Sequence, residues 1–184
     1  MVEPSGRGAP GHAAPVGPGG LDALRATARA IRSARRTVVV GSGDGAGPAQ
    51  ALGRLGPVLG HDVRLALGSS TAQAVHISQL QAGDCLVVLG VRPPARGLRG
   101  LTRLGRERGA TVCVLTEPRS SRLAEDAHHV VVTPVEGFRD GPSRTAMAAA
   151  VQGILAELAG TDPAHAFGAV RQVWDDLGVV DDRP

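Results

Sequence analysis

The chain has 184 residues, of which 42% are hydrophobic and only 2% aromatic, and its formal net charge is +3. This length and composition predict one domain with a core of Ala, Val, Leu and Ile, as in a parallel α/β sheet. All 20 basic residues are Arg, which excludes Schiff-base chemistry and a Lys general base. The arginines are scattered, so direct nucleic-acid binding is not expected. No apolar run approaches the roughly 20 residues that a membrane helix needs.

The chain divides into three parts. Residues 1–20 are rich in Gly and Pro and show no periodicity, which predicts a disordered tail. This tail has no apolar signal core, so we expect a cytoplasmic protein. The predicted domain covers residues 21–160, and residues 161–184 form a C-terminal helix and tail that pack on the domain or on a partner subunit.

Helical and strand patterns alternate along the domain. Apolar residues at helical spacing predict a first helix that carries Leu21, Leu24, Ala28 and Ile31 and a fourth helix that carries Leu98, Leu101 and Leu104. Further helices are predicted at about 47–59, 70–80, 143–159 and 163–177, with a short helical turn at 122–127. Short apolar runs predict strands at 37–41, 62–67, 85–90, 111–116 and 129–133.

This alternation predicts the fold class. Continuous apolar strands separated by helices form parallel sheets with right-handed crossovers, so we expect a three-layer α-β-α sandwich around a five-stranded parallel sheet. Such a sheet binds ligands beyond the carboxyl ends of its strands. The segments expected at that edge are 42–45, 68–71, 90–96, 116–121 and 134–140.

A glycine loop lies between the first strand and the next helix, with the sequence Gly41-Ser42-Gly43-Asp44-Gly45-Ala46-Gly47. Its glycines let a ligand approach the backbone, and the helix N-terminus supplies free N–H groups. We therefore predict that Ser42, Gly43, Asp44 and Gly45 contact a ligand. Asp44 would bind hydroxyls or an amine of the ligand, cap the helix N-terminus, or do both.

Further candidate ligand-binding residues lie in the other loops of this edge. Ser69, Ser70 and Thr71 lie at a strand-to-helix junction, where one would cap the helix and another would face the ligand. Ser70-Thr71-Ala72-Gln73 has the pattern of a capping box that opens the third helix. Ser120 and Ser121 carry the same two interpretations.

The order of elements and several phrases resemble the sugar isomerase (SIS) domain, most closely the version in RpiR-type regulators. The resemblance covers about residues 21–160 and is carried by Ala34-Arg35-Arg36-Thr37-Val38-Val39-Val40-Gly41-Ser42-Gly43, Leu55-Gly56 to His61-Asp62-Val63, Gly83 to Leu89, Arg108 to Thr116, and Ser121 to His128. It implies a five-stranded parallel sheet between helices, a homodimer or homotetramer, and a small-molecule ligand that is a sugar phosphate or a relative.

The chain departs from the family pattern where the family holds phosphate. SIS domains typically place a Ser in the first loop where this chain has Gly45, and a Ser-x-Ser-Gly-x-Thr loop where residues 90–95 have no hydroxyl. Asp44 adds a negative charge beside this position. Arg92 and Arg96, with Arg99, would grip an anion from the other side, or they are solvated surface charges.

Two residues are candidates for proton transfer. SIS isomerases commonly carry a Glu after the fifth strand as the base, and Glu136 matches that region; the alternative is a surface carboxylate or a helix-start charge. His128 would be a site acid or a histidine at the strand edge. Adjacent strand residues face opposite sides, so His128 and His129 are not expected to share a metal site.

We expect no cofactor and no metal. The cysteines Cys85 and Cys113 each lie inside a predicted buried strand and are interpreted as small core residues.

Three functions are compatible with these residues. The first is a ligand-binding SIS domain of the RpiR sensor type without a DNA-binding part, since residues 1–20 are too short for a helix-turn-helix. The second is a divergent SIS-fold enzyme, an aldose–ketose isomerase or a lyase acting on a modified sugar or another polar metabolite, with Glu136 as base. The third is an interaction protein with an inactive pocket.

Overall fold

The computed structural model describes residues 18–90, 97–117, 121–134, 145–161 and 163–179. In chain order the elements are α1 (Pro18–Ser33), β1 (Thr37–Ser42), the 3₁₀ turn η1 (Gly43–Gly45), α2 (Ala46–Val58), β2 (Val63–Ala66), α3 (Ser70–Ser78), β3 (Cys85–Gly90), α4 (Leu98–Glu107), β4 (Thr111–Thr116), α5 (Ser121–Ala124), β5 (His129–Val132), α6 (Thr145–Ala159) and α7 (Pro163–Leu177).

The five strands form one parallel sheet in the order β2-β1-β3-β4-β5. β3 is the central strand, and all six of its residues are buried. A strand covered on both faces has no solvent side, which explains why Cys85–Gly90 is a continuous apolar run without alternation. The predicted three-layer α/β fold is confirmed.

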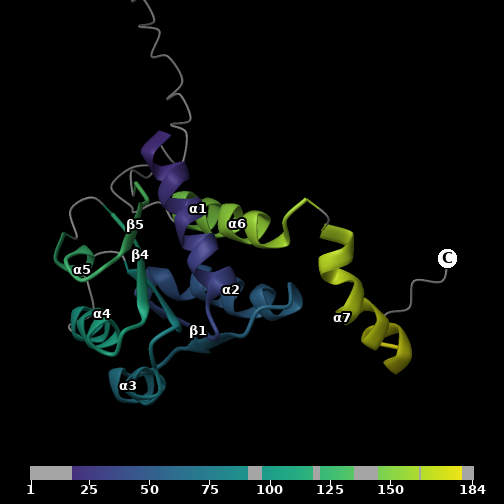
Figure 1. The fold of residues 1–184 in the computed structure, drawn as a ribbon, viewed down its shortest axis with the longest axis horizontal. Helices are drawn as coiled ribbons and strands as arrows, with labels where there is room; N and C mark the ends of the chain where they lie inside the picture. Colours follow the sequence, from purple (N-terminus) through teal and green to yellow (C-terminus); the bar gives the residue numbers. More distant parts are fainter. Residues whose placement is uncertain (1–17, 91–96, 118–120, 135–144, 162, 180–184) are drawn as a thin grey trace, which may run out of the picture.

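Alternate residues of the inner strands β1, β3 and β4 face two separate cores. On one face, Val39, Val87 and Leu115 pack with α1, α2 and α6. On the other face, Val40 and Val88 pack with α3, α4 and α5. Figure 1 shows the two helix layers on opposite sides of the sheet. The cysteines Cys85 and Cys113 belong to the first core, as predicted.

Two leucines at helical spacing from buried residues are exposed. Leu55 of α2 and Leu104 of α4 lie among the exposed large hydrophobic residues. In α2 the side facing the sheet is instead closed by glycines: a Cβ at Gly56 would lie 2.5 Å from Cγ2 of Val63. This close approach of helix and strand requires Gly at position 56.

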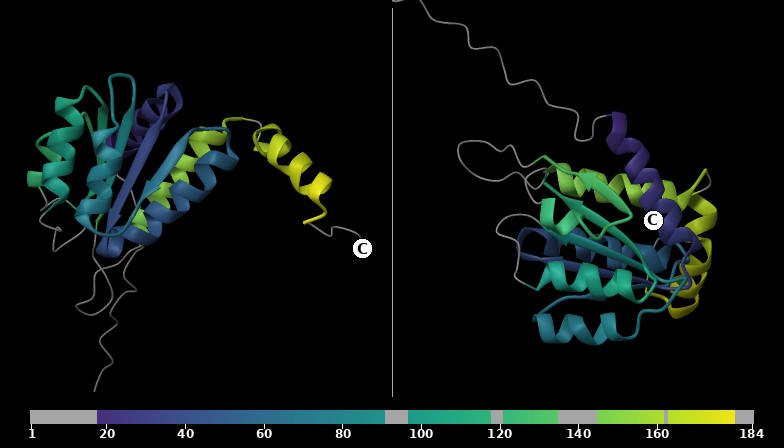
Figure 2. Two further views of the ribbon diagram at one scale, coloured as in Figure 1. Left: turned by 90° about the horizontal axis from the view of Figure 1, so that it is seen from below. Right: turned by 60° about the vertical axis from the view of Figure 1, so that its left-hand side comes forward.

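The C-terminal helix α7 extends away from the sheet, and its principal contacts are with α2 (Figures 1 and 2). Its apolar side chains are largely uncovered, with Phe167, Val173, Trp174 and Leu177 all exposed. Within the described residues, no helix combines the length and the apolar character required to cross a membrane.

Candidate ligand-binding site

The first loop of the predicted site begins at the end of β1. Ser42 is the last residue of that strand and pairs with Gly90 of β3. Gly43 then turns the chain with φ of +54°, a conformation that favours glycine. Gly45 is the N-cap of α2, so Asp44 does not occupy the predicted cap position and lies half-buried inside η1. The structure therefore brings Ser42, Gly43, Asp44 and Gly45 together between a strand end and a helix N-terminus.

Gly45 is pressed against the neighbouring strand. A Cβ at this position would lie 2.4 Å from the backbone oxygen of Leu89 in β3. A serine at this position therefore has no room unless the backbone moves. The turn closes directly onto the end of β3, which gives a physical reason for glycine at this position.

The second loop places three hydroxyl residues at the start of α3. Ser69 is the N-cap: its Oγ accepts a hydrogen bond from the Ala72 N–H at 3.3 Å. The predicted capping box is therefore wrong by one residue, because Ser70 is already the first residue of the helix. Ser69, Ser70 and Thr71 are all exposed at this helix N-terminus.

The N-termini of α3 and α4 meet at this edge. A Cβ at Gly97, the N-cap of α4, would lie 2.6 Å from Oγ of Ser70. Two helix N-termini therefore direct free N–H groups to the same edge of the sheet, an arrangement that favours an anionic group.

The structure does not test the remaining loop candidates. Ser121 is the first residue of α5, downstream of β4. Arg92, Arg96, Ser120 and Glu136 lie outside the described residues. Arg99, the third arginine of the predicted anion grip, pairs with Glu125, with 2.5 Å between Nη2 and Oε2.

His128 lies away from these residues, at the amino-terminal end of β5. Its Nδ1 accepts a hydrogen bond from the Val112 N–H at 2.9 Å, which ties β5 to β4. Burial lowers the pKa of the His128 imidazole, and electrostatic interactions with Arg106 and His129 lower it further. The structure does not bring His128 together with the glycine turn.

Sequence reasoning missed three polar residues at the carboxyl ends of β4 and β5. Thr116, Glu117 and Thr133 are all buried, and Glu117 is only 2% exposed. The signal for Glu117 was a charged residue directly after the strand that ends at Thr116, in a segment where the prediction named only Ser120 and Ser121.

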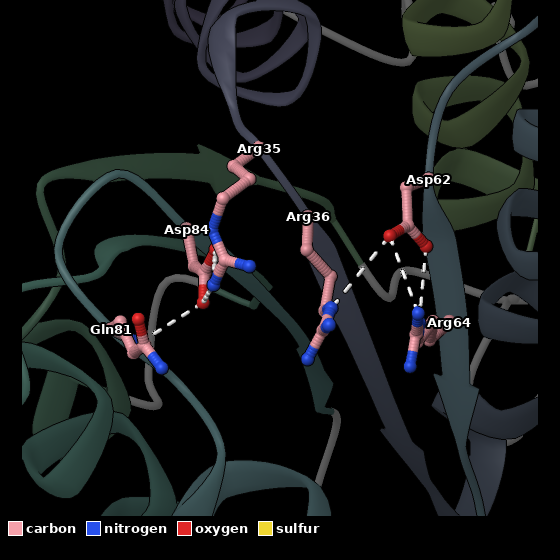
Figure 3. Close-up of polar contacts among 6 residues, drawn as sticks. All are labelled: Arg35, Arg36, Asp62, Arg64, Gln81 and Asp84. Carbon is pink, nitrogen blue, oxygen red and sulfur yellow. Dashed lines mark hydrogen bonds and ion pairs between the residues drawn. The ribbon is translucent and has the colours of Figure 1, made fainter.

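A charged cluster occupies the opposite edge of the sheet (Figure 3). Just before β1 and β3, Arg35 Nη2 lies 2.9 Å from Oδ1 of the buried Asp84 and donates to Oδ2 at 3.0 Å. Asp62 pairs with Arg36 and Arg64 just before β2. These pairs hold the strand starts together and leave the carboxyl edge for a ligand.

A metal centre is not formed by the described part of the chain, which contains no group of three or more His, Cys, Asp or Glu side chains arranged to hold an ion. The Sγ atoms of Cys85 and Cys113 lie 3.9 Å apart in the core as free thiols.

Solved structures share this fold. The sugar isomerase domain of an RpiR transcription factor from Sphaerobacter thermophilus is 27% identical, with a TM-score of 0.77 over 86% of this chain and 87% of that one. The Vibrio vulnificus NanR protein complexed with ManNAc-6P is 16% identical (TM-score 0.71; 85% of this chain, 61% of that one). A Methanococcus jannaschii protein, for which a molecular function of 3-hexulose-6-phosphate isomerase was inferred from its crystal structure, is 10% identical (TM-score 0.66; 80% of this chain, 83% of that one).

No protein-family model matches the chain, and no curated protein matches it. The fold itself defines a parallel α/β domain whose ligand edge lies at the carboxyl ends of the strands. The chain has the fold of the sugar isomerase (SIS) domain, and it is similar to the version found in an RpiR transcription factor.

Proposed function

We propose that this SIS domain binds a sugar phosphate or a related carbohydrate derivative at the carboxyl edge of its sheet and acts as a sensor of the RpiR type. The observation that carries this proposal is the likeness to the RpiR sugar isomerase domain, at 27% identity over 86% of this chain. The NanR complex with ManNAc-6P adds that another protein of this fold takes such a ligand.

The local geometry supports a ligand with one anionic end. The N-termini of α2, α3 and α4 supply free N–H groups and partial positive charge at this edge. Gly45 leaves no space for the serine of the family pattern, so the phosphate would lose that hydroxyl. We propose that Arg92 and Arg96 replace the missing hydroxyl contacts, because guanidinium groups bind phosphate through paired hydrogen bonds.

A thermal-shift screen of the full chain tests the proposal. The panel contains pentose 5-phosphates, hexose 6-phosphates, N-acetylhexosamine 6-phosphates, the same sugars without phosphate, and inorganic phosphate. A ligand that binds only the folded state raises the melting temperature by mass action. We expect stabilisation by at least one sugar phosphate at millimolar concentration. A flat response across all sugars would contradict ligand binding and favour a pure interaction protein.

The lack of space for a side chain at Gly45 also favours a second candidate function, a divergent enzyme of the same fold that acts on a modified sugar. In this case Glu136 would move a proton between adjacent sugar carbons. The substitution Glu136→Gln separates the two functions. It would abolish turnover in an enzyme, whereas a sensor would keep most of its ligand affinity.

We further propose that the protein is a cytoplasmic homodimer or homotetramer and that it does not itself bind nucleic acid. Support for association comes from the exposed apolar side of α7. A 15-residue helix gains most of its stability from packing an apolar face, and this face is largely open in the single chain.

A further inference from the structure

Glu117 and Thr133 are neighbours at the carboxyl edge of the sheet. Each is the first residue after its strand, Glu117 after β4 and Thr133 after β5. The Thr133 N–H donates to the backbone carbonyl oxygen of Thr116 at 2.8 Å, which continues the strand pairing by one residue. Because Thr116 is paired with Val132, the next residues of the two strands, Glu117 and Thr133, lie side by side.

Both residues continue the face of the sheet that lies under α1, α2 and α6. The residues two positions earlier, Leu115 and Val131, belong to the core on that face. Side chains alternate along a strand, so Glu117 and Thr133 follow them on the same side. Thr116 falls on the other face: a Cβ on its register partner Gly90 would point at Leu98 and Leu123.

This placement is costly for the fold. Thr133 is fully buried, and among the described residues its Oγ1 has no hydrogen-bond partner. Glu117 is 2% exposed, and burial of a carboxylate is unfavourable unless hydrogen bonds compensate for the lost hydration. A valine and a leucine would satisfy the core at these two positions. Buried polar side chains at the edge where such sheets bind ligands are typical of a binding site.

We propose that Glu117 and Thr133 form the subsite for the hydroxyl groups of the ligand, an inference that rests on the proposed carbohydrate-binding function. A carboxylate has about four acceptor positions, so it can accept hydrogen bonds from two neighbouring sugar hydroxyls and still keep a protein partner. The threonine hydroxyl both donates and accepts, so it fits a further sugar hydroxyl.

The subsite has a defined chemical preference. The negative charge of Glu117 repels a phosphate, so the anionic end lies at the helix N-termini and the polyol end over β4 and β5. The ligand class is therefore a polyhydroxylated chain or ring, and the subsite distinguishes it from simple anions.

The test compares Glu117→Gln and Thr133→Val with the control Thr116→Val. The control removes a hydroxyl that is also buried and without a partner among the described residues, one position away and on the opposite face. Affinity is measured by titration calorimetry with the strongest-binding sugar phosphate of the panel and, separately, with inorganic phosphate. Urea unfolding of each variant establishes that it is folded.

We expect Glu117→Gln to weaken sugar phosphate binding by about 10- to 100-fold, because charge-assisted hydrogen bonds to the sugar are lost. Thr133→Val should weaken it by about 3- to 10-fold, because one neutral hydrogen bond is lost. Neither variant should weaken the binding of inorganic phosphate, and Thr116→Val should leave the affinity for both ligands unchanged. Equal losses for both ligands, or wild-type affinity in both site variants, would overturn the subsite.

Failure of the proposed function is a different result. In that case the wild-type protein binds none of the sugars, and the subsite proposal is rejected together with the proposed function. Wild-type binding with unaffected variants leaves the binding function standing and removes only the subsite. If Glu117→Gln does not fold, the comparison of Thr133→Val with Thr116→Val decides the outcome.

Discussion

Arg35 and Asp84 join the start of β1 to the start of β3, with 2.9 Å between Nη2 of the arginine and Oδ1 of the aspartate. The Asp84 side chain is fully buried, whereas the Arg35 side chain is 52% exposed. Oδ2 of Asp84 also accepts the Gln81 N–H at 3.0 Å. The carboxylate therefore fixes the turn before the central strand as well as the chain that enters β1.

Asp84→Ala should lower the free energy of unfolding by about 1–3 kcal/mol, because the Gln81 N–H and the guanidinium lose their acceptor. Because the Arg35 side chain is half exposed, the loss of unfolding free energy should be smaller than for a fully buried ion pair. Urea unfolding measures the change. The control is Arg103→Ala, which breaks the exposed pair with Glu107 and should cost no more than about 0.5 kcal/mol. A similar loss in both variants would contradict the structural role of Asp84.

Gly45→Ala should destabilise the domain by about 1–3 kcal/mol, since its Cβ would meet the Leu89 backbone oxygen at 2.4 Å. Gly45→Ser, which restores the family residue, should be at least as unfavourable and should not improve binding of inorganic phosphate. The matched control is Gly47→Ala in the same helix start, where nothing lies within 4 Å of the added Cβ. That variant should be neutral or more stable by at most about 1 kcal/mol. A stable Gly45→Ser protein with tighter phosphate binding would refute this account.

His128 makes the domain less stable in mild acid. Its pKa is lowered in the folded state, so between that pKa and the unfolded value near 6.5 the unfolded chain binds more protons. Stability should therefore rise with pH through this window, whereas below the folded-state pKa both states are protonated and His128 adds no further change. Protonation of Nδ1 also removes the acceptor of the Val112 N–H. Urea midpoints between pH 5 and 8 should show this slope in the wild type and a smaller slope in His128→Asn, with His76→Gln unchanged from the wild type.

The buried thiols should be unreactive in the native protein. A hydrogen bond with Cys113 and burial raise the pKa of the Cys85 thiol well above its ordinary value, so the nucleophilic thiolate is scarce at pH 8. A colorimetric thiol reagent should label both cysteines within minutes in guanidinium chloride and neither in the folded chain. Rapid labelling without denaturant would show that the core around β3 and β4 opens readily.

The exposed side of α7 should mediate association. Val173→Glu combined with Leu177→Glu places two charges on the apolar side and should shift the protein to the monomer in light scattering after gel filtration. Gln172→Glu, which adds a charge elsewhere on the same helix, serves as the control. The emission of Trp174, the only tryptophan, should move to shorter wavelength as protein concentration rises. An oligomer that survives the double substitution would place the interface on another surface.

Much of the framework could be predicted because its signals are local. The continuous apolar runs at β3 and β4 gave those strands their observed bounds, and the glycine turn after β1 could be placed at the ligand edge. The N-cap of α3 was wrong by one residue because Ser69 and Ser70 carry the same chemistry, and only the backbone decides which hydroxyl meets the Ala72 N–H.

The sequence alone determined which segments are strands and helices, since hydrophobic periodicity and glycine placement depend on neighbouring residues. The tertiary structure decided which strands and which residues are neighbours in space. It placed β3 between β1 and β4, set Gly45 against Leu89, and moved His128 to the far edge. It also brought Glu117 beside Thr133 through the pairing of β4 with β5. Strand order and register arise from packing between residues far apart in the chain, and no local pattern in one sequence encodes that packing.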